Sequence, residues 1–443
     1  MKWKVLMLGL LASTGLGASV QAQGPMTLKD CIQYGLQHHQ LNVISENQIA
    51  LAKQQKREGL ASYLPQVNGS VSFDDNIKRQ TSVIPAGAFS PQEIRIQFGN
   101  QYNTNAVVQV DQTIFNRSLL MGIKALDPLG EVAELNKEKN EQSLMYGAAM
   151  SYYQVQIYSE QKALLSENET KFAKMEKILA LQLSQGVIRQ VDYDRVAVTL
   201  ANIRAQVKVL ESEIEMAINR LKNAIGMSLD APIEIADGEW RKEDAIGEVP
   251  TQPNTGRVLD LRIMEKNLEM QEIDLRRKQA MYLPTLNAYA RFGAQSFGDD
   301  FGQSFSNWFG YTSIGLKLNV PIWNSFRTPA VIKQSELNLM TARANQKITK
   351  SNIELQQQNA ASQWNNAQSS LQTNIANLNL AKSVLDVTQL QYEQGVATLS
   401  DYLNSDYGVK EAQTNYITSL LRSLSARLEY EKAKGTLDTF LLN

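Results

Sequence analysis

The sequence predicts a mixed α and β protein made of two similar halves, each combining a pair of strands with very long helices. Three observations lead to this fold class. Short motifs recur in the same order in both halves, segments of alternating polar and apolar residues follow one of these motifs, and long stretches lack both glycine and proline. An internal duplication of one strand-and-helix unit explains all three.

The duplication is visible in residues that end helices or form turns. The Tyr-Leu-Pro sequence at 63–65 recurs at 282–284, and the Gly-Val pair at 186–187 recurs at 395–396. The first half is longer than the second after its Tyr-Leu-Pro. The additional residues fall in the stretch 84–102, rich in Pro, Gly and polar residues, which we expect to form a longer surface loop.

Strands are expected after each Tyr-Leu-Pro, because proline cannot continue the helix that precedes it. Apolar residues alternate with polar or small ones there, as in a strand between an apolar and a wet environment. The apolar positions are Val67, Val71, Phe73, Leu286, Ala288, Ala290, Phe292, Ile314, Leu316, Leu318 and Val320. Aromatic residues gather at the ends of these segments, which favours a membrane β-barrel over a soluble sandwich.

The helices are expected to be exceptionally long. The stretch from Ala330 to Gln394 contains no Gly and no Pro, so it would form about 100 Å of helix. Large residues recur every seven positions within it, the spacing of a coiled-coil seam. They are Trp364, Leu371, Leu378, Leu385 and Tyr392. The matching stretch 131–185 follows Pro128, so we expect a kink or break in the first half only.

The N-terminus reads as a secretory signal peptide covering residues 1–22, with a basic start, a short apolar stretch and a small-residue cleavage site that ends at Ala22. No later stretch approaches the roughly 20 apolar residues of a membrane helix, so a membrane position would require a β-barrel. The 44 basic and 45 acidic residues balance, which gives no indication of nucleic-acid binding.

An enzyme is not indicated. The two histidines, His38 and His39, are neighbours that point in different directions from one helix, and no phosphate-binding loop or nucleophile motif is present. We therefore expect no catalytic residue, no cofactor and no metal site. The single cysteine, Cys31, cannot form an intrachain disulfide and is expected to be a small packed residue.

With these features the chain resembles the TolC-like outer-membrane efflux protein family over nearly all of its mature length. The resemblance rests on Thr27-Leu28, both Tyr-Leu-Pro sequences, the sequence Val-Pro-Ile-Trp-Asn at 320–324, and residues 392–398 leading to Asp401. It implies a homotrimer in which four strands per chain form a 12-stranded outer-membrane β-barrel. This barrel continues into a long periplasmic α-helical coiled-coil barrel.

The resemblance also implies a domain division and a function. The first repeat would cover 23–228, an equatorial linker 229–255 and the second repeat 256–443. The protein would be the exit duct of a tripartite efflux or type I secretion system. Its partners would be a periplasmic adaptor, an inner-membrane RND or ABC pump and outer-membrane lipid. A periplasmic coiled-coil adaptor or scaffold is the alternative; the long helices fit it, whereas paired strands with aromatic ends fit it poorly.

Two glycines mark the expected docking tips. Gly186 and Gly395 each lie between two long helices, and glycine suits such a reversal because it reaches positive φ at low cost. Val187 and Val396 follow them directly. In the family these turns contact the adaptor, so the resemblance assigns these four residues to adaptor docking.

A gate is expected beside the tips. Tyr392 could donate a hydrogen bond to Asp192 and hold the two hairpins together, or it could simply end the seven-residue seam as a packed aromatic. The family's second latch has no counterpart, because Ala397 and Val191 replace its arginine and hydroxyl partners.

A ring of carboxylates is expected in the lumen of the trimer. Asp401 would supply three like charges that bind cations. A second family acid is Asn404 in this chain, so we expect the ring to be weaker than in the family.

Overall fold

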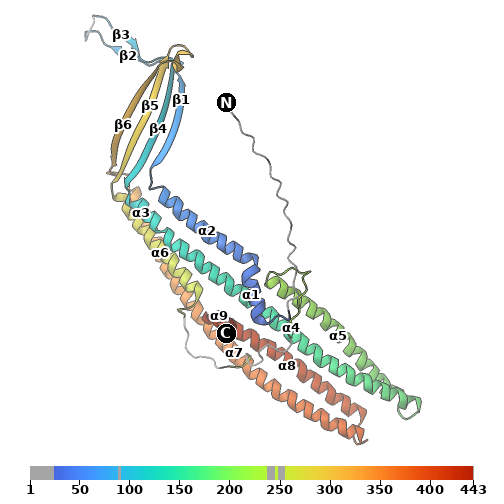
Figure 1. Cartoon of the computed structure of the whole chain (residues 1–443). Helices are drawn as coiled ribbons and strands as arrows, with labels where there is room; N and C mark the ends of the chain where they lie inside the picture. The colour runs from blue at the N-terminus through green and yellow to red at the C-terminus, as the bar shows by residue number, and fades with distance from the viewer. Residues whose placement is uncertain (1–23, 88–90, 237–244, 248–254, 443) are drawn as a thin grey trace.

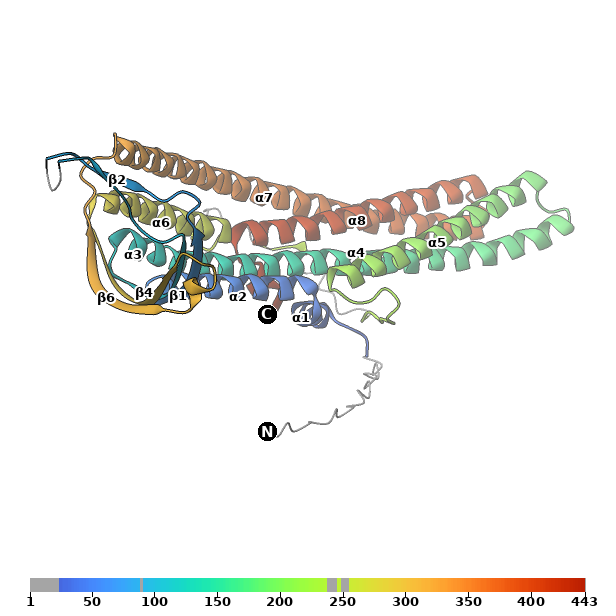
Figure 2. The same ribbon diagram turned by 90° about the horizontal axis from the view of Figure 1, so that it is seen from above.

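The computed structural model describes residues 24–87, 91–236, 245–247 and 255–442, so the expected signal peptide lies outside the described residues. The molecule is elongated, with a curved sheet at one end and two helical hairpins reaching away from it (Figures 1 and 2). In the first half the elements are α1 (Leu28–His38), α2 (Gln40–Ala61), β1 (Gln66–Asp75), β2 (Thr81–Ile84), β3 (Ile94–Gln97), β4 (Tyr102–Phe115), α3 (Arg117–Lys124), α4 (Leu126–Ser184) and α5 (Gln190–Ala224).

The second half repeats this order without the additional hairpin. Its elements are α6 (Leu259–Gln279), β5 (Thr285–Gly298), β6 (Trp308–Asn319), α7 (Arg327–Glu393), α8 (Leu399–Lys434) and the short α9 (Leu437–Leu442). Both Tyr-Leu-Pro sequences end a helix as predicted, since β1 and β5 each begin directly after the proline.

The four long strands form one antiparallel sheet in the order β1-β4-β5-β6. The two strand pairs join through β4 and β5, so β1 and β6 are left with one free edge each in the single chain. The expectation of a plain loop at 84–102 is wrong in part. Strands β2 and β3 pair as a separate two-stranded hairpin, with Thr81 opposite Gln97 and Ile84 opposite Ile94.

The sheet has an apolar and a polar face. Val71, Ile314 and Leu316 lie on the apolar face and are 75%, 79% and 71% exposed in the single chain. The alternate positions carry polar side chains such as Gln109 and Lys317. A uniform apolar face of this size on a water-exposed sheet requires a covering partner or an apolar solvent.

The helices confirm the predicted break in the first half only. Helix α3 ends at Lys124, and α4 begins at Leu126, two residues before Pro128. Pro128 lies in the first turn of α4, where the backbone N–H groups have no partner within the helix. In the second half, α7 runs unbroken from Arg327 to Glu393.

The coiled-coil seam and the core are well defined. Trp364, Leu371, Leu378 and Leu385 are all buried, as the seven-residue spacing predicts. The main core lies where α1, α4, α5, α8 and α9 meet. It includes Ile32, Tyr152, Tyr153, Leu221, Leu424, Leu428 and Leu437. In the part of the chain that the structure describes, no helix is both long and apolar enough to cross a membrane.

The described parts of the segment between the halves are bound to the helices. Ser423 Oγ donates a hydrogen bond to the carbonyl of Ala245 at 2.6 Å, and the Gly247 N–H donates to Gln368 Oε1 at 2.9 Å. Gly247 also lies against the Trp364 ring and the Arg427 guanidinium. Residues 245–247 therefore pack against α7 and α8.

Four equivalent glycines end the long helices with positive φ: Gly186 at 71°, Gly226 at 71°, Gly395 at 75° and Gly435 at 75°. In each turn the N–H of the following residue bonds to the carbonyl five positions before it, which is a Schellman motif. The surroundings differ. A Cβ at Gly395 would meet nothing within 4 Å, whereas at Gly435 it would lie 2.7 Å from the Arg257 carbonyl oxygen.

This difference predicts unequal effects of one substitution. Gly395→Ala should cost roughly 1–2 kcal/mol, the cost of placing an L-residue in the left-handed region. Gly435→Ala adds a backbone clash and should lower the unfolding temperature of the purified protein at least twice as much. Equal shifts for the two variants would contradict the packing at Gly435.

Candidate functional site: the helical tips and the polar face of the sheet

The two turns predicted as docking tips form the ends of the helical hairpins. Gly186 joins α4 to α5 and Gly395 joins α7 to α8, and the two tips lie at the end of the molecule remote from the sheet (Figure 1). The N–H of Val187 bonds to the Gln182 carbonyl at 2.9 Å, and that of Val396 bonds to the Gln391 carbonyl at 2.8 Å. The side chains of Val187 and Val396 are 67% and 75% exposed. Each tip thus presents an apolar side chain from a fixed turn.

The helix that leaves the second tip begins with a capping box. Thr398 Oγ1 accepts a hydrogen bond from the Asp401 N–H at 3.2 Å, and Asp401 Oδ2 accepts one from the Thr398 N–H at 3.0 Å. Hydrogen bonds from Thr398 lower the pKa of Asp401 below its ordinary value. Asp401 therefore stays ionised at neutral pH, and both it and Asn404 are exposed along one side of α8.

The first tip lacks this capping box. Arg189 stands where the second half has Thr398, and its guanidinium instead binds the carboxylate of Asp192, with Nε 3.0 Å from Oδ2. An ion pair between side chains three residues apart holds the start of α5.

The hydrogen bond predicted from Tyr392 to Asp192 is not formed in this structure, which describes both residues. Tyr392 packs against Tyr402 with ring centroids 5.7 Å apart, beside Leu385. Burial raises the pKa of Tyr392, and the charge of Asp192 adds to the effect. The aromatic therefore ends the seam, close enough to Asp192 to feel its charge. The roles of both residues in a gate stay predictions.

Contacts between the two hairpins near the tips involve residues that sequence reasoning missed. The Lys410 ammonium lies 4.4 Å from the centre of the Phe172 ring on α4, and Lys171 lies 5.4 Å from that of Tyr402 on α8. Lys410 also pairs with the buried carboxylate of Asp406 at 2.9 Å. The i, i+4 spacing of Asp406 and Lys410 was visible in the sequence, but their aromatic partner on another helix was not.

These contacts predict how Tyr392 variants behave. Tyr392→Phe should leave the conductance of reconstituted protein in planar bilayers nearly unchanged, because the hydroxyl makes no bond to Asp192. Tyr392→Ala should raise the conductance, because it removes the ring that packs on Tyr402. An increase with Tyr392→Phe would show instead that the hydroxyl bonds Asp192 in the assembled protein.

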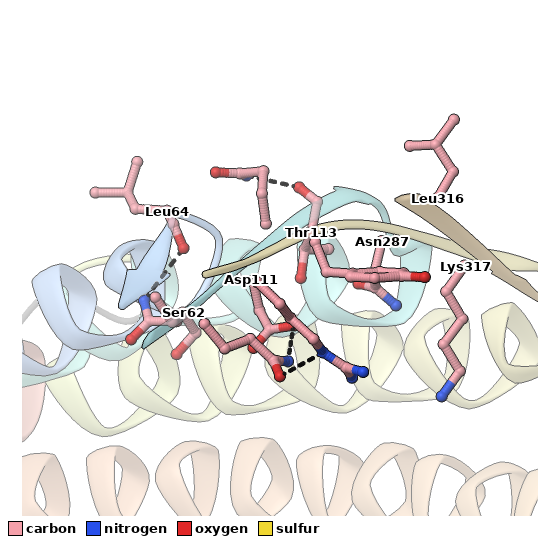
Figure 3. A pocket seen from close by; sticks show the side chains of 12 residues that line it. Ser62, Leu64, Asp111, Thr113, Asn287, Leu316 and Lys317 are labelled. Carbon is pink, nitrogen blue, oxygen red and sulfur yellow. Dashed lines mark hydrogen bonds between the residues drawn. The ribbon is translucent and has the colours of Figure 1, made fainter. Parts of the chain in front are cut away.

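A second polar site lies on the sheet, where the strands meet the helices. A hollow of about 440 Å³ is lined there by residues of β1, β4, β5 and β6 and of the turn before β1 (Figure 3). Arg291 Nε donates to Gln109 Oε1 at 2.8 Å, and Gln109 Nε2 donates to the Asp111 carboxylate at 2.7 and 2.8 Å. Lys317 lines the same hollow from β6. None of these four residues was predicted from the sequence to form a site.

Comparisons with known proteins agree with this architecture. Residues 256–436 match the model of the family described as outer membrane efflux protein. The outer membrane protein TolC of Salmonella enteritidis is 20% identical over 353 residues, covering 76% of this chain and 70% of the relative. TolC of Escherichia coli strain K12 is 20% identical over 360 residues, covering 76% of this chain and 71% of the relative.

Solved structures show the same fold. The CmeC outer membrane channel of Campylobacter jejuni has a TM-score of 0.74 at 15% identity and covers 93% of this chain and 86% of that one. VceC of Vibrio cholerae has a TM-score of 0.72 at 15% identity, covering 92% and 96%. The open state of the MtrE channel of Neisseria gonorrhoeae has a TM-score of 0.72 at 16% identity, covering 93% and 89%.

The joined sheet and helical hairpins, taken with these matches, show that the chain has the fold of the TolC-like outer-membrane channels. Residues 256–436 carry the signature of the outer membrane efflux protein family, and the chain as a whole is similar to TolC in sequence and to these channels in fold.

Proposed function

We propose that the protein is the outer-membrane exit duct of a tripartite efflux or type I secretion system, through which solutes pass from an inner-membrane pump to the outside. The observation that carries the proposal is a four-stranded sheet with one apolar and one polar face, joined directly to helical hairpins. The apolar face suits lipid and the polar face suits a water-filled lumen.

Three copies of the chain complete such a duct. A sheet with free edges at β1 and β6 cannot remain in lipid, because its backbone groups would lack partners. Three sheets of four strands would close a 12-stranded barrel and remove every free edge. The long helices of the same three chains would then continue the barrel as a periplasmic tunnel.

The partners follow from this arrangement. The exposed valines that follow the tip glycines, Val187 and Val396, would contact a periplasmic adaptor, which links the duct to an RND or ABC pump. The charged and aromatic residues beside the tips, including Asp192, Tyr392 and Asp401, would form the gate. The alternative of a periplasmic scaffold leaves the apolar face of the sheet unexplained, and it predicts release from membranes by salt rather than by detergent.

Cysteine labelling in intact cells tests the topology. The native Cys31 is fully buried, and burial raises the pKa of its thiol to about 12, so it should not react with the maleimide. Ala86→Cys, in the turn after β2, and Asn307→Cys, in the turn before β6, should react with a membrane-impermeant maleimide in intact cells. Gln185→Cys at the first helical tip is the matched control and should react only after lysis. Labelling of Gln185→Cys in intact cells, with the two sheet positions silent, would overturn the proposal.

A further inference from the structure

We propose that the hollow at the helix end of the sheet is a binding site for small anionic solutes, with Lys317 and Arg291 as its anion-binding groups. The inference rests on the proposed function in one respect, since it takes the polar face of the sheet as the side along which solutes pass. The class of ligand, carboxylate- or phosphate-bearing small molecules, follows from the charges that line the hollow.

The strand register brings the charged residues together on one face. Gln109 lies opposite Arg291, Asp111 opposite Tyr289, and Asn287 opposite Lys317. Figure 3 shows the side chains of Asp111 and Lys317 on one side of the sheet and that of Leu316 on the other. The hollow of about 440 Å³ has room for a small organic or inorganic anion.

Tyr289 directs Arg291 towards the other cation. The Arg291 guanidinium stacks on the Tyr289 ring at 5.0 Å, and Tyr289 lies nearer to Lys317 along the sheet than Arg291 does. The bond to Gln109 uses only one of the five N–H donors of the guanidinium. The remaining donors are available to an oxyanion, which an arginine can bind with two parallel hydrogen bonds.

Gly315 leaves room for the Tyr289 ring to lie against the wall of the hollow. A Cβ at Gly315 would lie 2.6 Å from the Tyr289 hydroxyl, so the ring lies flat over Gly315 on the neighbouring strand. Tyr311 lies over Gly293 in the same way, with 2.5 Å between that Cβ and the ring. Such aromatic–glycine pairs across strands fix the register, and the pair of Tyr289 with Gly315 also holds the Tyr289 ring against the wall of the hollow.

The charge balance favours anions. The hollow contains two cations and one carboxylate, and the carboxylate of Asp111 already receives two hydrogen bonds from the Gln109 amide. Lys317 forms no ion pair with any residue that the structure describes. Three copies would therefore surround the lumen with a net positive charge, opposite in sign to the Asp401 carboxylates at the tips. A charged, partly enclosed wall concentrates ions of opposite sign.

Equilibrium binding of pyrophosphate to the purified full-length protein in detergent tests the site without requiring transport. ³¹P NMR titrations at low ionic strength should show saturable binding by the unaltered protein. Lys317→Gln should weaken binding about three- to five-fold, the range expected for one solvent-exposed charge, and Lys317→Arg should restore it. Asp111→Asn should tighten binding, because it removes the repelling charge and keeps an acceptor for Gln109.

Matched controls separate a site from a general charge effect. Lys333→Gln makes the same change on the exposed surface of α7 and should leave the affinity unaltered. No saturable binding by the unaltered protein, or equal losses for Lys317→Gln and Lys333→Gln, would overturn the proposal. Misfolding cannot make Asp111→Asn bind pyrophosphate more tightly. Weaker binding by Lys317→Gln together with tighter binding by Asp111→Asn would therefore support the proposal. Failure of the protein to insert or to export would count against the proposed function and would leave this binding result standing.

Discussion

Replacing both tip valines with aspartate, in the double variant Val187→Asp with Val396→Asp, is expected to abolish efflux while leaving the amount of protein in the outer membrane unchanged. Both side chains are more than half exposed and lie outside the hydrophobic clusters, so the substitution should cost little folding stability. At a docked interface, however, an unpaired carboxylate loses water without gaining a partner, which costs about 2–5 kcal/mol. That cost would lower adaptor affinity by a factor of at least about 30.

The measurement is export of a pump substrate from cells that supply the cognate adaptor and pump but no other channel. Val187→Thr with Val396→Thr is the matched control, because threonine keeps the shape of valine without adding a charge, and export should remain largely intact. Co-purification of the adaptor should fail for the aspartate variant alone. Normal export by the aspartate variant would show that the adaptor does not dock at these turns.

These tips were predictable from the sequence because they depend on local geometry. A glycine between two uninterrupted helical stretches indicates a reversal with positive φ, and the structure gives Gly186 and Gly395 φ values of 71° and 75°. The strands were predictable for a similar reason, since alternation with period two is a property of neighbouring residues. Duplication reinforced both predictions, because each feature was seen twice.

The hairpin of β2 and β3 shows where local patterns are insufficient. Each of these strands has only four residues, too few for alternation to stand out against a stretch rich in proline and glycine. The salt bridge between Arg79 and Asp299, at 3.2 Å, ties the base of this hairpin to the turn after β5. That pair is more than two hundred positions apart, and nothing in the sequence links the two residues.

The gate residues show how a local contact replaces a distant one. The sequence led us to pair Asp192 with Tyr392 across two hairpins. In the structure Arg189, one helical turn from Asp192, forms an ion pair with that carboxylate. A pair within one turn requires little additional ordering of the chain, whereas a pair between helices depends on their exact placement. The hollow on the sheet was not predictable from the sequence, because Gln109, Arg291 and Lys317 come together only through strand register.

The exposed carboxylate of Asp401 leads to the second large expected effect, a change in block by divalent cations. Three copies around a narrow tip would bind a divalent cation, and the lowered pKa keeps each carboxylate charged at neutral pH. Hydrogen bonds from Thr398 lower the pKa of Asp401, whereas repulsion between three carboxylates in a ring raises it, so block should be present at neutral pH and weaken as acid protonates the carboxylates.

Substitutions at two positions of α8 should shift this block in opposite directions. Asp401→Asn removes the charges yet keeps an oxygen that can accept the Thr398 hydrogen bonds, so it should weaken Mg²⁺ block of reconstituted trimers about ten-fold without loss of the helix cap. Asn404→Asp, one turn further along the same exposed side, adds a carboxylate per chain and should strengthen block several-fold. Asp127→Asn, at the other end of α4, makes the same chemical change far from the tips and should have no effect.

The measurement is single-channel conductance against Mg²⁺ concentration in planar bilayers. If block is unchanged in both Asp401→Asn and Asn404→Asp, no carboxylate ring lies in this part of the tip. Stronger block with Asn404→Asp alone would mean that residue 404 faces the lumen while Asp401 serves only as the cap of α8.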